Sequence, residues 1–288
     1  MFRQITIIGV GLIGGSMARA LRQGCADGDV VEKIIGYGRD KVHLQQALDL
    51  GVIDSYELDI GRAVANADLI LLAVPVAAME DVFTEIRPHL AADAIITDVG
   101  SAKVAVIEAA RHGLGERLSS FIPGHPIAGT EQSGVVASFA ELFENRRVIL
   151  TPLPENTAAT VNRVRELWTL CGAEVVEMAA AHHDEVLAAT SHLPHLLAYS
   201  LVDLLAGLDD SEDIFTYAAG GFRDFTRIAS SDPVMWRDIC LANREAVLVL
   251  LDQFSKGIDK LGKSIRDGNG EQLMEVFSRA KEVRDRIK

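Results

Sequence analysis

The sequence has few cysteines and no long apolar run, which excludes two classes of protein. Only three cysteines (Cys25, Cys171 and Cys240) occur among 288 residues, and they are widely spaced with no C-x-x-C pair. This excludes a scaffold stapled by disulfides and predicts small buried thiols in a reducing compartment. The longest apolar run, residues 69–79, is interrupted by Pro75 and is too short to span a bilayer. We therefore expect no membrane segment.

Positive charge is also scarce. Lys and Arg total 28 against 41 Asp and Glu, a net charge of −13, and no run of basic residues occurs. Proteins that bind nucleic acid duplexes neutralise phosphates with a basic stripe, so no nucleic acid partner is expected. The first residues lead straight into a strand-like segment, unlike a secretory signal. These features predict a cytoplasmic protein with a small-molecule substrate, in which a local group of donors holds any anionic ligand.

The chain divides into a part with strands and a part without them. Short β-branched runs alternate with helical patterns up to about residue 178, which predicts a doubly wound, mainly parallel α/β sheet. Beyond that point every pattern is helical, including long segments at residues 239–261 and 271–287. We expect an α/β domain at residues 1–178 and an all-α domain at 179–288. The predicted strands lie at residues 5–8, 33–37, 69–74, 94–98, 120–124, 147–151 and 174–177.

Two apolar helical segments near the C-terminus predict how the protein assembles. The segments at residues 239–261 and 271–287 are too apolar for helices that expose one face to water. One edge of an α/β domain is too small to cover them. We therefore expect the helical domain to form a homodimer.

A glycine-rich segment follows the first strand. Residues 5–16 read ITIIGVGLIGGS, which places G-x-G-x-x-G between a strand and a helix. In this pattern Gly9 permits the tight turn, Gly11 lets the backbone approach a pyrophosphate, and Gly14 allows close packing of helix on strand. The free N–H groups at the start of the helix bind the anion. The pattern predicts a Rossmann-type domain that binds a dinucleotide.

The choice of dinucleotide depends on the end of the second strand. NAD-binding domains place a carboxylate there for the ribose 2′-OH. Asp27 and Asp29 lie in a loop before the strand, whereas its end carries Gly38 and Arg39. A cation without a carboxylate favours NADP, with NAD possible; alternatively, Arg39 is a surface charge and Asp40 caps the next helix. The predicted cofactor contacts are Gly9, Gly11, Leu12, Ile13, Gly14, Gly38, Arg39, Val74 and Pro75.

Further motifs point to a known family. They are DVGSAK (residues 98–103), GHPIAGTE (124–131), SHLPH (191–195) and GGFRDFTRIA (220–229). With these motifs the sequence resembles the prephenate/arogenate (cyclohexadienyl) dehydrogenases of tyrosine biosynthesis, over nearly the whole chain. The resemblance implies a Rossmann domain, a helical dimerisation domain and an NAD(P)-dependent oxidative decarboxylation. Its products would be 4-hydroxyphenylpyruvate from prephenate and tyrosine from arogenate, and the sequence does not decide between these substrates.

The resemblance assigns roles to individual residues. His125 matches the catalytic base, and imidazole has a suitable pKa for accepting a proton from the ring hydroxyl. Ser101 matches a serine that hydrogen-bonds that histidine and the hydroxyl. Arg227 matches an arginine that binds a substrate carboxylate, for which its planar fork is suited. Arg223 is a neighbouring alternative, or else a structural partner for an acidic side chain. The expected substrate-binding residues are His195, Arg227, Thr130, Glu131, Gly220 and Trp236.

Three of these residues carry a more specific expectation. Thr130 and Glu131 would line the substrate entrance, with Glu131 paired to Arg227 because an unpaired carboxylate would repel an anionic substrate. Trp236 is either a core aromatic or, as in the family, a residue that reaches into the partner subunit's site.

Other interpretations remain open. A dehydrogenase of β-hydroxyacids would use a lysine in the helical domain, but the corresponding stretch reads His183-Asp184-Glu185 and the next lysine is Lys256. A non-catalytic NADP-binding sensor would bind cofactor without turnover. The histidines at 182, 183, 192 and 195 raise the question of zinc, although hydride transfer needs no metal and H-x-x-H alone is weak evidence. We expect no metal.

Overall fold

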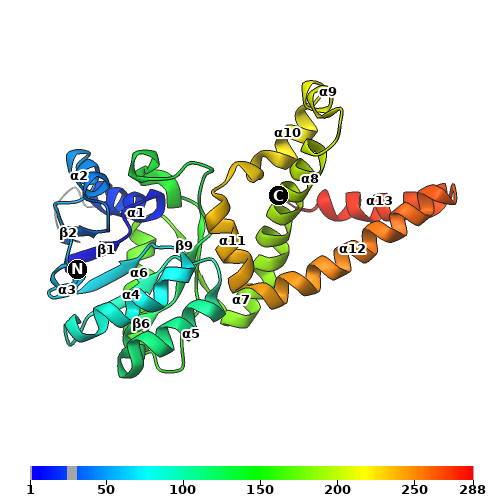
Figure 1. The fold of residues 1–288 in the computed structure, drawn as a ribbon. Helices are drawn as coiled ribbons and strands as arrows, with labels where there is room; N and C mark the ends of the chain where they lie inside the picture. Colours follow the sequence, from blue (N-terminus) through cyan, green and yellow to red (C-terminus); the bar gives the residue numbers. More distant parts are fainter. Residues whose placement is uncertain (1, 25–30, 288) are drawn as a thin grey trace. The chain divides into compact units, whose positions relative to one another are not determined.

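In a computed structural model, which describes residues 2–24 and 31–287, the chain separates into two compact units, Met1–Asn243 and Arg244–Lys288. Cys25, Asp27 and Asp29 lie outside the described residues. The first unit contains a six-stranded, all-parallel sheet with the order β3-β2-β1-β4-β5-β6 (Figure 1). Its strands are β1 (Phe2–Ile8), β2 (Val31–Tyr37), β3 (Ser55–Glu57), β4 (Leu69–Leu72), β5 (Ile95–Asp98) and β6 (Phe121–Ile122).

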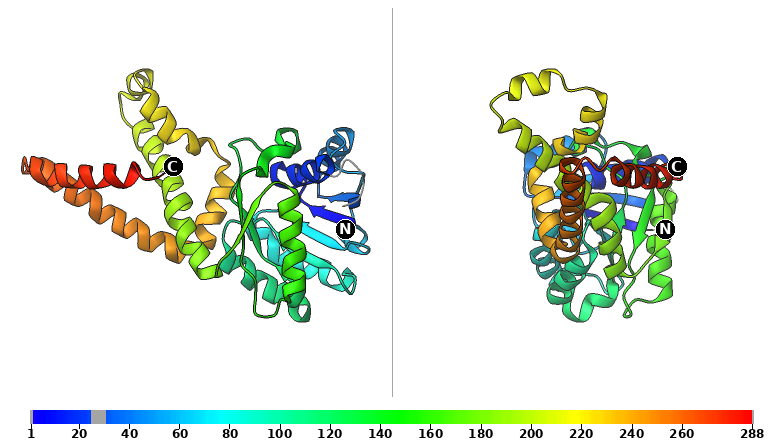
Figure 2. Two further views of the ribbon diagram at one scale, coloured as in Figure 1. Left: turned by 180° about the vertical axis from the view of Figure 1, so that it is seen from behind. Right: turned by 90° about the vertical axis from the view of Figure 1, so that its right-hand side faces the viewer.

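Both faces of this sheet are covered by helices. In β4, Leu69 and Leu71 belong to one hydrophobic cluster and Ile70 and Leu72 to the other, because successive side chains of a strand point to opposite faces. The first cluster includes side chains of α1 (Leu12–Gln23), α2 (Lys41–Asp49) and α6 (Ala158–Leu170), and α6 is clearest in the left view of Figure 2. The second includes α3 (Ile60–Val64), α4 (Met79–Ile86) and α5 (Lys103–Leu114). This is the doubly wound arrangement expected from the sequence.

The last three strands form a separate sheet, although the sequence pattern predicted a single one. The predicted strand at residues 120–124 is wrong as a single element, because β6 ends at Ile122 and β7 (Gly124–Pro126) begins a second sheet. Pro123 lies between them and has no N–H to continue a ladder. In the second sheet β8 (Arg147–Leu150) pairs antiparallel with β7 and parallel with β9 (Glu174–Glu177).

A helical region completes the first unit. α7 (Ala180–Leu187) continues through one π-helical turn at Ala188–His192 into α8 (Leu193–Ala206). Pro194 cannot donate to the carbonyl four residues before it, and such wide turns inside helices are common at functional sites. The remaining helices are α9 (Ser211–Thr216), α10 (Gly220–Thr226) and α11 (Pro233–Ala242).

The second unit is a pair of helices, α12 (Arg244–Arg266) and α13 (Gly270–Arg284), which turn back on each other near residue 268 (Figure 2). The predicted continuous helix at residues 239–261 is wrong, because Asn243 ends α11 and α12 starts at the next residue. Large apolar side chains of this unit, Phe254, Ile258, Met274 and Phe277 among them, are exposed. Among the described residues, no helix is both long and apolar enough to cross a membrane.

Candidate active site

The glycine loop between β1 and α1 has the geometry of a phosphate cradle. Gly9 has φ of +94°, and a Cβ there would lie 2.4 Å from the Ala73 carbonyl oxygen. A Cβ on Gly14 would lie 2.5 Å from the Gly9 carbonyl oxygen, whereas a Cβ on Gly11 would meet nothing within 4 Å. Among the described residues no side chain caps the start of α1, so its first N–H groups remain available to an anion such as a pyrophosphate. Of the other predicted contacts, Leu12 and Ile13 open α1, while Val74 and Pro75 follow β4.

The end of β2 presents a cation and no available carboxylate. Gly38 and Arg39 follow Tyr37, and the Arg39 side chain is exposed. The Asp40 carboxylate accepts hydrogen bonds from the backbone N–H groups of Val42 (2.8 Å) and His43 (3.3 Å), and so caps α2. Within the described parts of the chain, no carboxylate pairs with Arg39.

A buried ion pair supports the strand that carries the expected base. Lys103 Nζ lies 2.5 Å from Asp98 Oδ2 and 2.5 Å from the Gly124 carbonyl oxygen, and both side chains are 0% exposed. Gly124 N–H donates to Asp98 Oδ1 (3.0 Å). The pair therefore holds both sides of the residue before His125. Burial lowers the pKa of Lys103, and the charge of Asp98 opposes that change.

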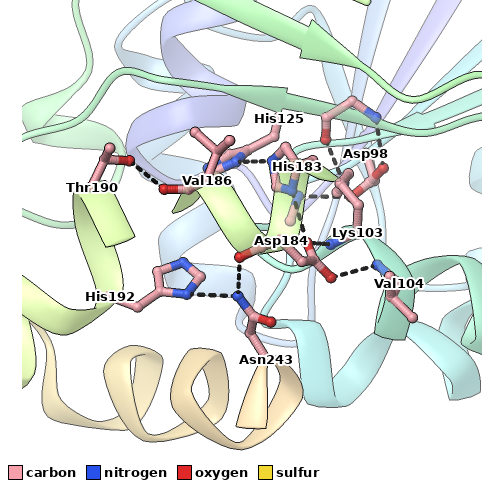
Figure 3. Close-up of polar contacts among 12 residues, drawn as sticks. Asp98, Lys103, Val104, His125, His183, Asp184, Val186, Thr190, His192 and Asn243 are labelled. Atoms are coloured by element: carbon pink, nitrogen blue, oxygen red, sulfur yellow. Dashed lines mark hydrogen bonds and ion pairs between the residues drawn. The ribbon is translucent and has the colours of Figure 1, made fainter. Parts of the chain in front are cut away.

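His125 lies on β7 and is only 8% exposed. Its Nδ1 is 2.9 Å from Nε2 of His183, and Nδ1 of His183 is 2.7 Å from Oδ1 of Asp184 (Figure 3). Burial, followed by the charges of His183, Lys103 and His192, holds the pKa of His125 well below its ordinary value. His125 is therefore neutral at pH 7 and can accept a proton.

Asp184 connects this chain of histidines to α5. Its Oδ1 accepts from the backbone N–H of Lys103 (2.7 Å) and its Oδ2 from that of Val104 (2.9 Å). Ala102, at the N-cap of α5, makes no side-chain cap, so a carboxylate from α7 satisfies those first N–H groups. From the sequence, His183 and Asp184 entered only the questions of a zinc site and of a β-hydroxyacid dehydrogenase, and this role was missed.

The role expected for Ser101 beside His125 stays a prediction. Ser101 is half-buried in the loop before α5, and no hydrogen bond joins it to His125 among the residues that the structure describes. The hydrogen-bond partner of the His125 ring is Nε2 of His183, at its Nδ1.

The π-helical turn and α11 form the next part of the site. The Asn243 side-chain amide donates to the Asp184 carbonyl oxygen (2.8 Å) and to Nδ1 of His192 (3.1 Å), which leaves the ring proton of His192 on Nε2. The His195 ring stacks on Trp236 with centroids 3.5 Å apart and donates from Nδ1 to the Ser191 carbonyl oxygen.

Two buried N–H donors remain without an acceptor in this region. Within the described chain, neither Nε2 of His192 nor Nε1 of Trp236 has a hydrogen-bond partner, and the two ring centroids are 6.1 Å apart. Trp236 is 8% exposed and packs on its own chain's His195; its implied role in a partner's site stays a prediction.

The expected entrance residues lie at the surface. Arg227 and Glu131 form the expected ion pair, with side chains 62% and 31% exposed. Arg223 is exposed and, among the described residues, has no acidic partner. Gly220 begins α10 with open space around it, and the Thr130 hydroxyl accepts from the Gln132 N–H. No group of three or more potential ligands among the described residues is arranged to hold a metal ion.

A doubly wound sheet, a glycine-rich helix start without a side-chain cap and a buried neutral histidine on β7 are together the features of an NAD(P)-dependent dehydrogenase. Two family models match: the prephenate dehydrogenase nucleotide-binding domain at residues 17–177 and the prephenate dehydrogenase dimerization domain at residues 179–279. The chain therefore belongs to the prephenate dehydrogenase family, which confirms the family and the fold class expected from the sequence.

Individual relatives extend this finding. The cyclohexadienyl dehydrogenase of Zymomonas mobilis is 42% identical over 100% of this chain and 97% of its own length. The crystal structure of prephenate dehydrogenase from Aquifex aeolicus, in complex with hydroxyphenyl propionate and NAD+, has 37% identity and a TM-score of 0.91, and covers 100% of this chain and 99% of that one. The structure of Synechocystis arogenate dehydrogenase has 28% identity and a TM-score of 0.80, covering 99% of this chain and 100% of that one.

Proposed function

We propose that this protein oxidatively decarboxylates prephenate, arogenate or both, with His125 as the base. The observation that carries the proposal is the buried imidazole of His125, which is neutral, is bonded through Nδ1 to His183, and has no partner for Nε2 among the described residues. It lies one residue beyond Gly124, which is bonded to Asp98 at the carboxyl end of β5. Ligands of open α/β sheets bind at that edge.

His125 supplies the proton acceptor for the reaction. When bound, the nicotinamide supplies the hydride acceptor. As hydride leaves ring C4 of the substrate, the 4-hydroxyl proton passes to Nε2 of His125. The bond between the ring and its carboxylate then breaks, CO2 departs, and the electron pair left behind aromatises the ring. The oxygen becomes a phenolate that takes the proton back from His125.

The substrate carboxylates need charged or strong donors. Arg227 is the proposed partner for one carboxylate, in exchange for its ion pair with Glu131. His195 is the proposed second contact, since its ring is held by Ser191 and Trp236. Nε2 of His192 and Nε1 of Trp236 have no acceptor within the described chain. The oxygen atoms of a substrate would accept hydrogen bonds from these two N–H groups. Thr130 and Gly220 complete the proposed entrance, and Ser101 is retained as a contact of the substrate hydroxyl.

We further propose a boundary near residue 178 and a homodimer formed through the helical part. The family matches change from nucleotide-binding to dimerization domain between residues 177 and 179. The exposed apolar side chains of α12 and α13 have no cover within their own unit. Sedimentation at micromolar concentration is expected to show a dimer, and a monomer would contradict the proposal.

For the cofactor we propose NADP over NAD. The support is the exposed Arg39 beside Gly38, which has no acidic partner among the described residues, together with the use of the Asp40 carboxylate as a helix cap. We propose the nine residues predicted from the sequence as its contacts.

The test of the function is a set of initial rates with prephenate and arogenate, each with NAD and NADP. Turnover of at least one pair supports the proposal. If cofactor raises the melting temperature but no pair turns over, the protein is a cofactor-binding sensor instead.

A further inference from the structure

The contacts of His125 also indicate which of its two ring nitrogens carries the proton. A histidine accepts a proton through Nε2 only when its own ring proton is on Nδ1. Nothing in the ring itself fixes that choice, so a neighbouring acceptor at Nδ1 must do so. In this chain the neighbour is Nε2 of His183, which lies on helix α7, at 2.9 Å from Nδ1 of His125 on strand β7.

The proton positions follow from the far end of the chain of contacts. Both oxygens of the Asp184 carboxylate accept backbone N–H groups at the start of α5, Oδ1 from Lys103 and Oδ2 from Val104, as is typical of a carboxylate at a helix N-terminus. An ionised carboxylate only accepts hydrogen bonds, so His183 must donate to it from Nδ1. With the ring proton of His183 on Nδ1, its Nε2 is the acceptor, and His125 donates to it from Nδ1.

We propose that His183 and Asp184 are positioning residues that hold His125 in the tautomer with an unprotonated Nε2 and stabilise its imidazolium. The proposal rests on the proposed function, in which Nε2 of His125 takes the hydroxyl proton. When that proton arrives, His125 carries N–H groups at both nitrogens, and its Nδ1–H remains bonded to His183. The positive charge is thereby linked through one imidazole to the Asp184 carboxylate, as in the buried part of a Ser-His-Asp triad.

Burial makes this arrangement effective. His183 is 0% exposed and Asp184 4% exposed, so water does not compete for their hydrogen bonds. The two histidine rings meet edge to face, with centroids 5.1 Å apart and an angle of 63° between their planes. Figure 3 shows His125, His183 and Asp184 following one another toward the start of α5.

Two substitutions of His183 separate positioning from folding. His183→Phe keeps a ring and removes both hydrogen bonds, whereas His183→Gln keeps an oxygen that can accept from His125. We expect His183→Phe to lower kcat by roughly 10²-fold with KM within about threefold, and His183→Gln to recover about tenfold of that loss. The matched control is His182→Phe, since His182 is the adjacent residue with a side chain 63% exposed and pairs only with Glu185. It is expected to leave kcat within about twofold of wild type.

The decisive measurement is the ring ¹⁵N NMR spectrum of the full-length protein with labelled histidine, with the His125 signals assigned by loss in His125→Asn. We expect wild-type His125 to show a protonated Nδ1 and an unprotonated Nε2 at pH 7.5, and His183→Phe to lose that preference. A protonated Nε2 in wild type, or a folded His183→Phe variant with unchanged kcat, would overturn the proposal. If His183→Phe fails to fold, the wild-type spectrum alone decides. Absence of turnover with either substrate would contradict the proposed function and leave the tautomer measurement valid.

Discussion

Two parts of the candidate site differ in how they hold charge. In the buried part, the Lys103–Asp98 pair is 0% exposed and every contact of the His125 chain is enclosed by protein. In the exposed part, Arg227 and Glu131 form an ion pair with side chains 62% and 31% exposed, and the Arg39 side chain is exposed. Charges withdrawn from water are costly to leave unpaired, whereas surface pairs exchange partners at little cost. We therefore expect the buried part to hold the catalytic groups in fixed positions. We expect the exposed part to bind and release anionic ligands.

The largest effect is expected at the base itself. His125→Asn removes the proton acceptor and should lower kcat by roughly 10² to 10⁴, the range for loss of a general base. KM and the Kd of the cofactor should change far less, because the glycine loop is untouched. The measurement is steady-state kinetics with cofactor titration, and His112→Asn, on the exposed side of α5 with a side chain 70% exposed, is the control. Turnover within a few-fold of wild type would remove His125 from its assigned role.

The buried ion pair gives the next largest effect, on stability. Lys103→Met leaves Asp98 charged and buried without its cation, which should cost about 3–5 kcal/mol of unfolding free energy. Arg227→Met breaks an exposed pair and should cost at most about 1 kcal/mol. Urea unfolding of both variants at one protein concentration measures the difference. An equal loss of unfolding free energy in the two variants would show that burial does not make the Lys103–Asp98 pair more important for stability than the Arg227–Glu131 pair.

Much of the fold could be predicted because its signals are local. The alternation of β-branched runs with helices and the G-x-G-x-x-G turn depend on neighbouring residues, and they identified the doubly wound sheet. The short edge strand β3 was missed because its three residues, Ser55–Glu57, have no apolar pattern and are only half-buried. The split at Pro123 and the break at Asn243 could not be placed because each depends on which segment pairs or packs next in space.

The candidate site divides in the same way. His125 and Arg227 were identified through motifs, and the structure adds the contacts that surround them. The bond from His183 to His125 spans 58 positions, and those from Asp184 to α5 span about 80, so no local pattern predicts them. Lys103 and Asp98 were visible in the DVGSAK motif, but only their burial shows that they support Gly124.

A pH effect on stability is expected from His192 in the buried part. Burial lowers its pKa from 6.5 to about 4. Between these values the unfolded chain binds a proton that the folded chain does not, so the stability present above pH 6.5 is lost as pH falls toward 4. The loss at the low end is roughly 3 kcal/mol. The unfolding free energy of wild type should therefore fall more steeply between pH 7.5 and 4.5 than that of His192→Gln.

The control for that comparison is His182→Gln, whose exposed side chain should leave the wild-type slope unchanged. Burial lowers the pKa of His125 as well, so His192→Gln should flatten the slope without abolishing it. Identical slopes for wild type and His192→Gln would contradict the assignment of the buried charge effect to His192.

The exposed part should respond in KM. Arg227→Ala removes a charge-assisted contact to a substrate carboxylate, of the kind worth about 1.5–3 kcal/mol, and KM should rise by about tenfold or more. Cofactor Kd should be unaffected, and kcat should change less than KM because the role proposed for Arg227 is to bind substrate at the entrance. Arg223→Ala is the matched control. A normal KM in Arg227→Ala with a raised KM in Arg223→Ala would transfer the role to Arg223.

The smallest effect is expected at Arg39, whose side chain is exposed. Its contact with a 2′-phosphate is screened by water, so we expect a preference for NADP of roughly tenfold, at the low end of charge-assisted bonds. The preference should weaken as salt rises. Arg39→Ala should abolish it, and Gly38→Asp should reverse it by accepting from the NAD 2′-OH and repelling the phosphate. The added side chain fits, because a Cβ on Gly38 would approach nothing closer than Leu44 at 3.6 Å. The measurement is kcat/KM for both cofactors in wild type and in the two variants at low and high salt. A wild type that prefers NAD, with both values unchanged in Arg39→Ala, would show that Arg39 is only a surface charge.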